Sequence, residues 1–126
     1  MAKIKSYSAG KLSKLLWIEC KRLVRQRDGN KCFTCGATGL KGSNQQTGHF
    51  IPSSTCGAFL RYDLRNLAIQ CARCNLWGGG EGALFYKNMV KKHGQEYVDQ
   101  IFKDKNKIVK ARDFYVERLL EYRKII

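Results

Sequence analysis

The sequence predicts a small α+β protein in which a metal-bound core of short strands is flanked by helices on both sides. Three observations indicate this class. Two CxxC pairs, Cys32 with Cys35 and Cys71 with Cys74, lie near the middle of the chain. Short runs with strand-like alternation lie between them, and helical periodicity precedes and follows them. At 126 residues, 44% of them hydrophobic, the chain has the length and composition of one folded domain.

A helix is predicted over residues 12–27. Its apolar residues recur at steps of three and four, which places them on one stripe of a helix. Asp28-Gly29-Asn30 ends it, and the first ten residues of the chain have no regular pattern, so we expect them to be loose. The basic residues of this helix lie mostly off the apolar stripe: Lys14, Lys21, Arg22, Arg25 and Arg27.

Two short strands are predicted between the cysteine pairs. QTGHFI at residues 46–51 is the first, ended by Pro52. NLAIQC at residues 66–71, with alternating apolar residues, is the second, and an irregular segment connects them. After a flexible joint, GGGEG at residues 78–82, we expect helices over residues 83–92, 95–102 and 109–122, with Gly94 as a C-terminal cap.

Positive charge is concentrated near the beginning of the chain. The net charge is +14, and residues 1–31 alone carry +7. A potential of this sign attracts phosphate backbones. A solvated surface or attraction to membrane lipids would also account for it, but no amphipathic anchor and no run of about 20 apolar residues occurs. We therefore expect nucleic acid as the partner, and no membrane.

The two CxxC pairs predict a metal site. No apolar segment of signal-peptide type follows the basic N-terminus, so we expect a cytoplasmic protein with reduced thiols. Two thiolates separated by two residues can bind one tetrahedral ion, and two such pairs complete its ligand shell. Disulfides and an iron–sulfur cluster are the alternatives. We expect one structural zinc ion per chain, bound by Cys32, Cys35, Cys71 and Cys74, while Cys20 is a core residue and Cys56 a loop residue.

His49 lies between the cysteine pairs, on the first predicted strand. A lone histidine is usually a structural side chain. Here, however, Asn66 begins the second strand, and Asn75 directly follows the last cysteine. This order places a histidine, an asparagine and a second asparagine of metal-ligand type around one metal site.

The segment GHFIP…LRNLAIQCARCN, which contains these residues, resembles the HNH, or ββα-metal, endonucleases. The segments RDGNKCFTCG, TGHF, LRYDLRNLAIQCARCN and YKNMVKKHGQEYVDQI are more closely similar to the phage NinG/Rap recombination endonucleases. The resemblance extends over residues 11–124. It implies a ββα-metal (HNH, His-Me finger) core in a single nuclease domain, with a basic N-terminal helix at residues 1–31, the zinc-bound core at 32–80 and helices at 81–126.

The resemblance also implies roles for the polar residues. His49 corresponds to the general base that activates water, for which a neutral imidazole near pH 7 is suited. Asn66 corresponds to the middle asparagine that fixes the loop, and Asn75 to a ligand of a catalytic divalent ion. Oxygen ligands favour Mg²⁺ or Mn²⁺ over zinc.

One position departs from the usual pattern. Many HNH enzymes carry Asp or His directly before the base, as a metal ligand, whereas this chain has Gly48. Asp63, the only carboxylate between residues 29 and 80, is the candidate replacement; a pair with Arg61 or Arg65 is the alternative. Arg61, Arg65 and Arg73 either clamp phosphates or are surface charge, and we expect Trp77 to pack beneath the zinc rather than stack on a base.

The favoured function is metal-dependent DNA endonuclease activity on branched recombination intermediates such as Holliday junctions or D-loops, with the branched substrate implied by the resemblance alone. A phage-encoded enzyme would act in the cytoplasm of its bacterial host. Two alternatives remain: a non-catalytic zinc-dependent DNA-binding module with a decayed HNH site, and an HNH nicking endonuclease of phage packaging or homing. Symmetric cleavage of a junction requires two active sites, hence a homodimer, although no interface signature is visible.

Overall fold

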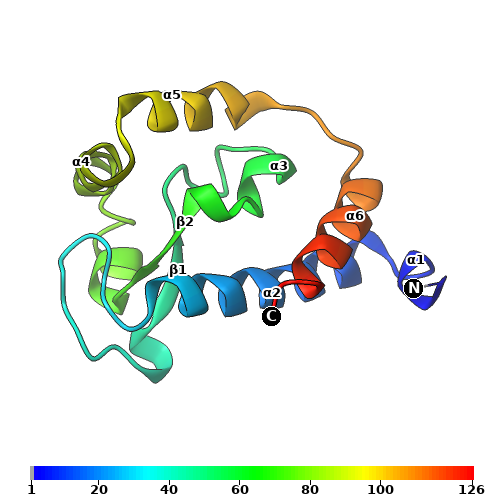
Figure 1. Cartoon of the computed structure of the whole chain (residues 1–126), viewed down its shortest axis with the longest axis horizontal. Coiled ribbons are helices and arrows are strands. Elements are labelled where there is room, and N and C mark those ends of the chain that lie inside the picture. Colours follow the sequence, from blue (N-terminus) through cyan, green and yellow to red (C-terminus); the bar gives the residue numbers. More distant parts are fainter. Residues whose placement is uncertain (1) are drawn as a thin grey trace.

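A two-stranded sheet lies at the centre of the protein and is surrounded by helices (Figure 1). The computed structural model describes residues 2–126. In chain order the elements are α1 Ala2–Lys5, α2 Ala9–Asp28, η1 Gly42–Asn44, β1 Gln46–His49, α3 Ala58–Arg61, η2 Leu64–Asn66, β2 Leu67–Gln70, η3 Arg73–Trp77, α4 Gly82–His93, α5 Gln95–Lys103, η4 Asp104–Asn106 and α6 Ala111–Arg123.

The predicted helices and strands are present, with small shifts at their ends. α2 begins three residues before the predicted start because the Ser8 hydroxyl accepts a hydrogen bond from the Lys11 amide and caps the first turn. We expected the first ten residues to be loose, but they include α1 and the start of α2. Ile4 of α1 is 8% exposed and belongs to the hydrophobic core, which explains why so short a helix is held in place.

The register of the sheet decides which side chains share a face. β1 and β2 are antiparallel, with Gln46 opposite Gln70 and Gly48 opposite Ala68. These four positions lie on one face of the hairpin, since directly opposed residues of an antiparallel pair point the same way. His49, opposite Leu67, lies on the other face.

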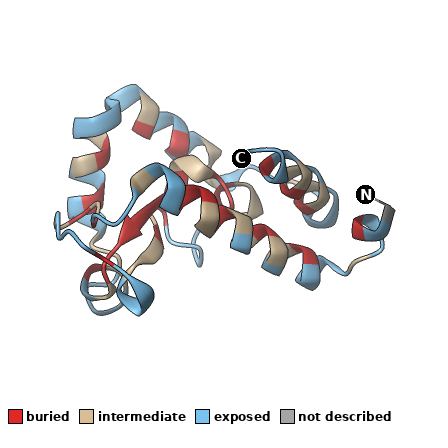
Figure 2. Ribbon diagram, turned by 60° about the horizontal axis from the view of Figure 1, so that its bottom comes forward, coloured by how far each residue is buried: buried red, intermediate tan, exposed pale blue. Residues whose placement is uncertain are grey.

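Two hydrophobic clusters support this sheet. The first joins α2 to α6 and includes the cysteine region (Figure 2 shows buried positions at intervals along α2). The hydroxyl of Tyr122 in α6 donates to the Tyr62 carbonyl at 2.7 Å, which ties this helix to the loop before β2. The second cluster packs α4 and α5 around Phe85 and Phe50.

No helix within residues 2–126 combines the length and the apolar character that crossing a membrane requires.

Candidate metal centre and polar site

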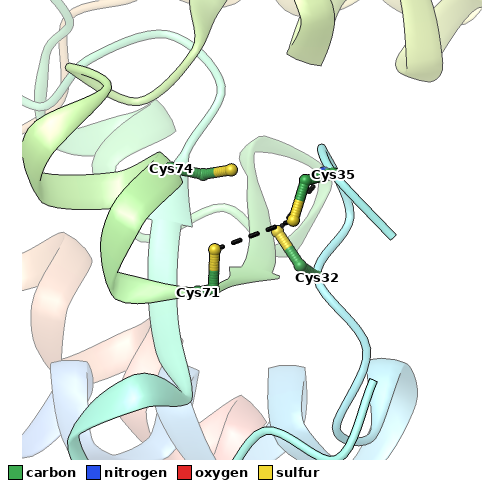
Figure 3. Close-up of side chains that lie close together, drawn as sticks. All are labelled: Cys32, Cys35, Cys71 and Cys74. Carbon is green, nitrogen blue, oxygen red and sulfur yellow. Dashed lines mark hydrogen bonds between the residues drawn. The ribbon is translucent and has the colours of Figure 1, made fainter. Parts of the chain in front are cut away.

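Four cysteine side chains converge between the end of α2 and the end of β2. The sulfur atoms of Cys32, Cys35, Cys71 and Cys74 all lie within 4.8 Å of one another (Figure 3). The Sγ atoms of Cys35 and Cys71 are 3.7 Å apart. Four sulfurs at about 2.3 Å from one zinc ion would be about 3.8 Å from each other in a tetrahedron, so this cluster could hold a zinc ion.

Local backbone contacts place the two cysteine pairs opposite each other. The amide of Cys32 donates to the Ala37 carbonyl at 2.8 Å, which closes the turn that carries the first pair. The amide of Phe33 donates to the Ile69 carbonyl at 2.8 Å, which attaches this turn to β2. Because the second pair follows directly after β2, the two turns approach one another.

The electrostatics of the cluster favour a bound cation. Burial opposes ionisation of Cys32, but the Cys35 amide and the Thr34 hydroxyl outweigh it and lower the pKa of this thiol to about 6. Burial raises the pKa of Cys74 to about 12, and the neighbouring thiols add to the rise. Four thiolates cannot coexist at this spacing without a positive ion, and thiolate is the form that binds zinc.

His49 is held in a defined tautomer on the other face of the sheet. Its Nε2 atom is 3.0 Å from the backbone carbonyl oxygen of Arg61. Because a carbonyl can only accept a hydrogen bond, Nε2 carries the proton and donates it. The neutral ring therefore keeps the lone pair on Nδ1.

Packing fixes both the plane and the charge state of this imidazole. Trp17 of α2 stacks on His49 with ring centroids 5.2 Å apart and an interplanar angle of 8°. Burial lowers the pKa of His49 below its usual 6.5; the bond to the Arg61 carbonyl opposes this effect, and the Arg61 charge adds to it. A neutral ring with a free Nδ1 can accept a proton near pH 7.

Asn66 joins the two ends of the loop between the strands. It is fully buried, and its Oδ1 accepts from the Ile51 amide at 2.8 Å. Its Nδ2 donates to the carbonyls of Ile51 at 3.0 Å and Leu60 at 3.3 Å. One amide thus fixes the start and the end of the loop that brings the Arg61 carbonyl to His49.

Asn75 follows the last cysteine and lies in the turn after β2, beside the face of the sheet that carries Gly48. Its Nδ2 donates to the Oε1 atom of Gln46 at 2.8 Å. Asn75 also lines an open groove of about 430 Å³, together with Trp17, Lys21 and Arg25 of α2. The groove therefore combines a polar amide, an aromatic ring that contacts His49 and two positive charges.

Gln70 is a polar residue that sequence reasoning missed. It is fully buried at the end of β2, and its Oε1 atom is a buried side-chain oxygen without a hydrogen-bond donor among residues 2–126. A side chain at Gly48 would meet it, because an ideal Cβ there is 1.8 Å from this atom. A glycine directly before His49, with a glutamine on the paired strand, was the available signal.

Asp63 has a different environment from the one expected for a metal ligand. Its two carboxylate oxygens accept hydrogen bonds from Arg65 at 2.6–3.1 Å, and Arg65 also pairs with Asp104 at 2.8 Å. Both oxygens are thus already used. The structure shows the ion pair with Arg65 that was the alternative, and a ligand role for Asp63 stays a prediction. Arg65 is likewise occupied with carboxylates.

The other predicted DNA-binding residues divide into two groups. Arg22 donates to the carbonyls of Tyr122 and Ile125 at 3.1 and 2.9 Å, and Arg61 donates to two carbonyls of its own loop. These guanidinium groups hold the backbone. Arg73 is exposed beside Cys35, and the exposed Lys14 precedes Trp17 on α2. The charges available to a ligand are Lys14, Lys21, Arg25 and Arg73.

Trp77 is 80% exposed, which contradicts the expectation that it packs beneath the metal site. It ends a π-helical turn whose buried residue is Cys74, and the turn directs the indole outward. Cys20 is a fully buried core residue, as expected. His93 is exposed and stacks on Tyr97 with centroids 4.2 Å apart, outside the polar site.

The sequence profile of the family described as "Bacteriophage Lambda NinG protein" matches residues 2–126. The chain belongs to the NinG family. It is similar to protein ninG of Escherichia phage 933W, with 31% identity over 85 residues, and to protein ninG of Escherichia phage lambda, with 29% identity over 85 residues. These alignments cover 67% of the chain and 41% and 40% of the two relatives, so the chain spans less than half of their length. No solved structure matches it.

Proposed function

We propose that this NinG-family chain is a metal-dependent DNA endonuclease of the HNH type, in which β1, β2 and the turn after them form the ββα-metal site. The observation that supports it best is the state of His49. Its Nε2–H is bound to the Arg61 carbonyl, and burial lowers its pKa, so Nδ1 carries a lone pair at neutral pH. A general base that activates water requires this state.

Each residue of the proposed site has its own task. His49 accepts the proton of the attacking water at Nδ1. Asn66 holds the loop so that the Arg61 carbonyl stays in place, which keeps the imidazole in one tautomer and orientation. Lys21 and Arg25 at the groove bind the phosphates next to the scissile bond. Asn75 would hold a divalent ion through its amide oxygen, and such an ion would supply Lewis-acid stabilisation of the charge on the phosphate and the leaving 3′ oxygen.

The zinc ion of the cysteine cluster has a structural task in this scheme. Four thiolates complete its ligand shell, so it has no open position for water or phosphate. Held by the four cysteines, it would connect the segment after α2 to the end of β2, and so would position the residues on either side of the second cysteine pair. Chemistry is left to His49 and to the second ion.

We propose DNA as the substrate class because of the net charge of +14 and the basic groove beside the polar site. Branched DNA, such as a Holliday junction or a D-loop, is suggested by the resemblance to the NinG/Rap recombination endonucleases. The test is cleavage of end-labelled linear, flapped and four-way DNA by the zinc-loaded protein, with Mg²⁺ or Mn²⁺ added. The expected result is metal-dependent cleavage, fastest on the four-way DNA.

The rival function is a non-catalytic, zinc-dependent DNA-binding module, and Gly48 is the observation that favours it, because the usual ligand is missing there. Binding of all three DNAs without cleavage in Mg²⁺ and in Mn²⁺ would support this rival. Equal cleavage of linear and four-way DNA would instead retain the nuclease and reject the branched substrate.

A further inference from the structure

The space beside Gly48 is filled by a side chain from the neighbouring strand. An ideal Cβ at Gly48 would lie 1.8 Å from Oε1 of Gln70 and 3.0 Å from Oδ1 of Asn75. The first distance is far below contact, so Gly48 and Gln70 can coexist only because residue 48 has no side chain. Two amide oxygens therefore point at the place from which a side chain directly before His49 would begin.

The orientation of the Gln70 amide is determined by its partners. Its Nε2 donates to the carbonyl of Gly80 at 2.9 Å, and a flipped amide would set two oxygens against each other. The Gly80 carbonyl reaches this position through a turn in which Gly79 and Gly80 have φ values of 64° and 88°. These values favour glycine, so the glycine run after the cysteines directs Oε1 of Gln70 toward Gly48.

A second chain of amides determines the orientation of Asn75. The Nε2 atom of Gln46 donates to the Ser43 carbonyl at 2.8 Å, which leaves Oε1 of Gln46 as an acceptor. Asn75 must therefore donate through Nδ2 to that oxygen, and does so at 2.8 Å. Its own Oδ1 is then the atom turned toward Gly48.

Among residues 2–126, the Gln70 oxygen lacks the hydrogen-bond donor or cation that a buried acceptor needs. A buried polar atom left without a hydrogen bond costs about 1–3 kcal/mol, and Oε1 is such an atom at a fully buried residue. Hard divalent cations take amide oxygens as ligands at about 2.1 Å, and a small shift of the two side chains brings both oxygens to one ion. Asn75, the second oxygen ligand, lines an open groove.

We propose that Gln70 supplies, from the adjacent strand, the metal ligand that Gly48 lacks, and that Oε1 of Gln70 and Oδ1 of Asn75 bind one Mg²⁺ or Mn²⁺ ion. The ion's catalytic role rests on the proposed nuclease function. Both ligands are uncharged, so binding to the free protein is weak. DNA phosphate oxygens complete the ligand shell and strengthen it. Amide oxygens are hard ligands, which separates this site from the thiolate cluster.

The test is a titration of the zinc-loaded, isotope-labelled protein with Mn²⁺, followed by paramagnetic broadening of its amide resonances in NMR. The wild type is expected to show broadening that begins at Gly48, Gln70 and Asn75. Gln70→Met keeps the side-chain volume but removes the oxygen, and it is expected to raise the titration midpoint by about tenfold or more. The matched control, Gln100→Ala on the exposed face of α5, is expected to titrate as the wild type does.

Moving the proposed ligand from residue 70 to residue 48 gives a second test, which does not depend on Gln70→Met alone. Gly48→Asp alone is expected to lose the site, because the new side chain collides with Gln70. The double variant Gly48→Asp with Gln70→Ala removes the collision and places a carboxylate in the same space. Recovery of Mn²⁺ broadening at residues 48 and 75 in this double variant is the expected result. Its absence, in protein with wild-type dispersion and zinc content, would contradict the proposal.

Cleavage of four-way DNA by the same proteins separates the two proposals. If Gln70→Met titrates and cleaves as the wild type does, Gln70 is no ligand, while the nuclease function stands. If Mn²⁺ binds at Gly48 and depends on Gln70, but no variant cleaves DNA, the ligand assignment stands and the nuclease function fails. Broadening that begins elsewhere overturns the metal site.

Discussion

The cysteine cluster and the polar site of Gln70 and Asn75 differ in chemistry, although they share one segment of chain. Gln70 directly precedes Cys71, and Asn75 directly follows Cys74. The cysteines bring four soft ligands together, and such a set could complete the shell of one zinc ion. The amides on either side bring two neutral oxygens to the space beside Gly48, and these alone would leave an ion's shell open. One closed site can thus fix the backbone on which an open site is assembled.

Removing the closed site should have the largest effect. Cys71→Ser is expected to unfold the protein or leave it insoluble, because zinc binding to such a cluster contributes about 10 kcal/mol or more to folding. Zinc analysis and thermal unfolding measure this. Cys56→Ala, a buried cysteine outside the cluster, is the matched control and is expected to keep one zinc per chain. A folded, zinc-free Cys71→Ser protein would contradict the structural role.

Removing the amide that holds the loop beside His49 should have a smaller effect on stability. Asn66→Ala deletes three buried hydrogen bonds to Ile51 and Leu60, and it is expected to lower the free energy of unfolding by about 2–4 kcal/mol. Urea unfolding of the zinc-loaded protein measures the change. Asn106→Ala, at an exposed turn, should leave stability near that of the wild type; a similar loss in both variants would argue against the specific role of Asn66.

The basic residues of α2 give the next comparison, because Lys21 and Arg25 line the groove whereas Arg22 binds backbone carbonyls. Lys21→Gln with Arg25→Gln is expected to weaken DNA binding and to reduce the salt dependence of log K by about two, one for each lost phosphate contact. Arg22→Gln should instead lower stability, because this guanidinium holds the carbonyls of Tyr122 and Ile125. Fluorescence anisotropy at several salt concentrations, with urea unfolding, distinguishes the two results. An unchanged salt slope in the double variant would place the DNA on another surface.

The charge state of His49 predicts the smallest effect. Burial lowers its pKa, so as the pH falls the unfolded chain takes up a proton on this histidine before the folded chain does. The stability that neutral His49 contributes is present above about pH 6.5 and declines as the pH falls toward the lower folded pKa. Single-turnover cleavage should decline over the same range, with an acid limb below pH 6.5. An acid limb above pH 6.5 would contradict the assignment of the base.

The two cysteine pairs were predictable because covalent spacing alone defines each pair. Two residues between paired thiols determine their geometry wherever the chain folds. Helix α2 was equally visible, since its apolar stripe recurs at the helical period. α1 was not, because a single buried residue, Ile4, holds it rather than any repeating pattern.

The polar site depends on register and on amide orientation, which the sequence does not display. Gln70 acquires meaning only when β2 places it on the same face as Gly48. Asp63 was the reasonable candidate by charge, yet its neighbour Arg65 takes both of its oxygens. Trp77 was expected to be buried by residue type, but the π-helical turn directs it outward. In each case a local contact outweighed composition.

In the proposed mechanism zinc positions the site while His49 performs the chemistry, and measurements on one variant separate these two roles. Zinc content, DNA affinity and single-turnover cleavage are measured on one preparation of His49→Ala, with His93→Ala, the other histidine, as the control. We predict that His49→Ala keeps one zinc and its DNA affinity but loses cleavage, because a general base acts in the transition state. Cleavage by His49→Ala at the rate of His93→Ala would contradict the assignment of His49 as the base.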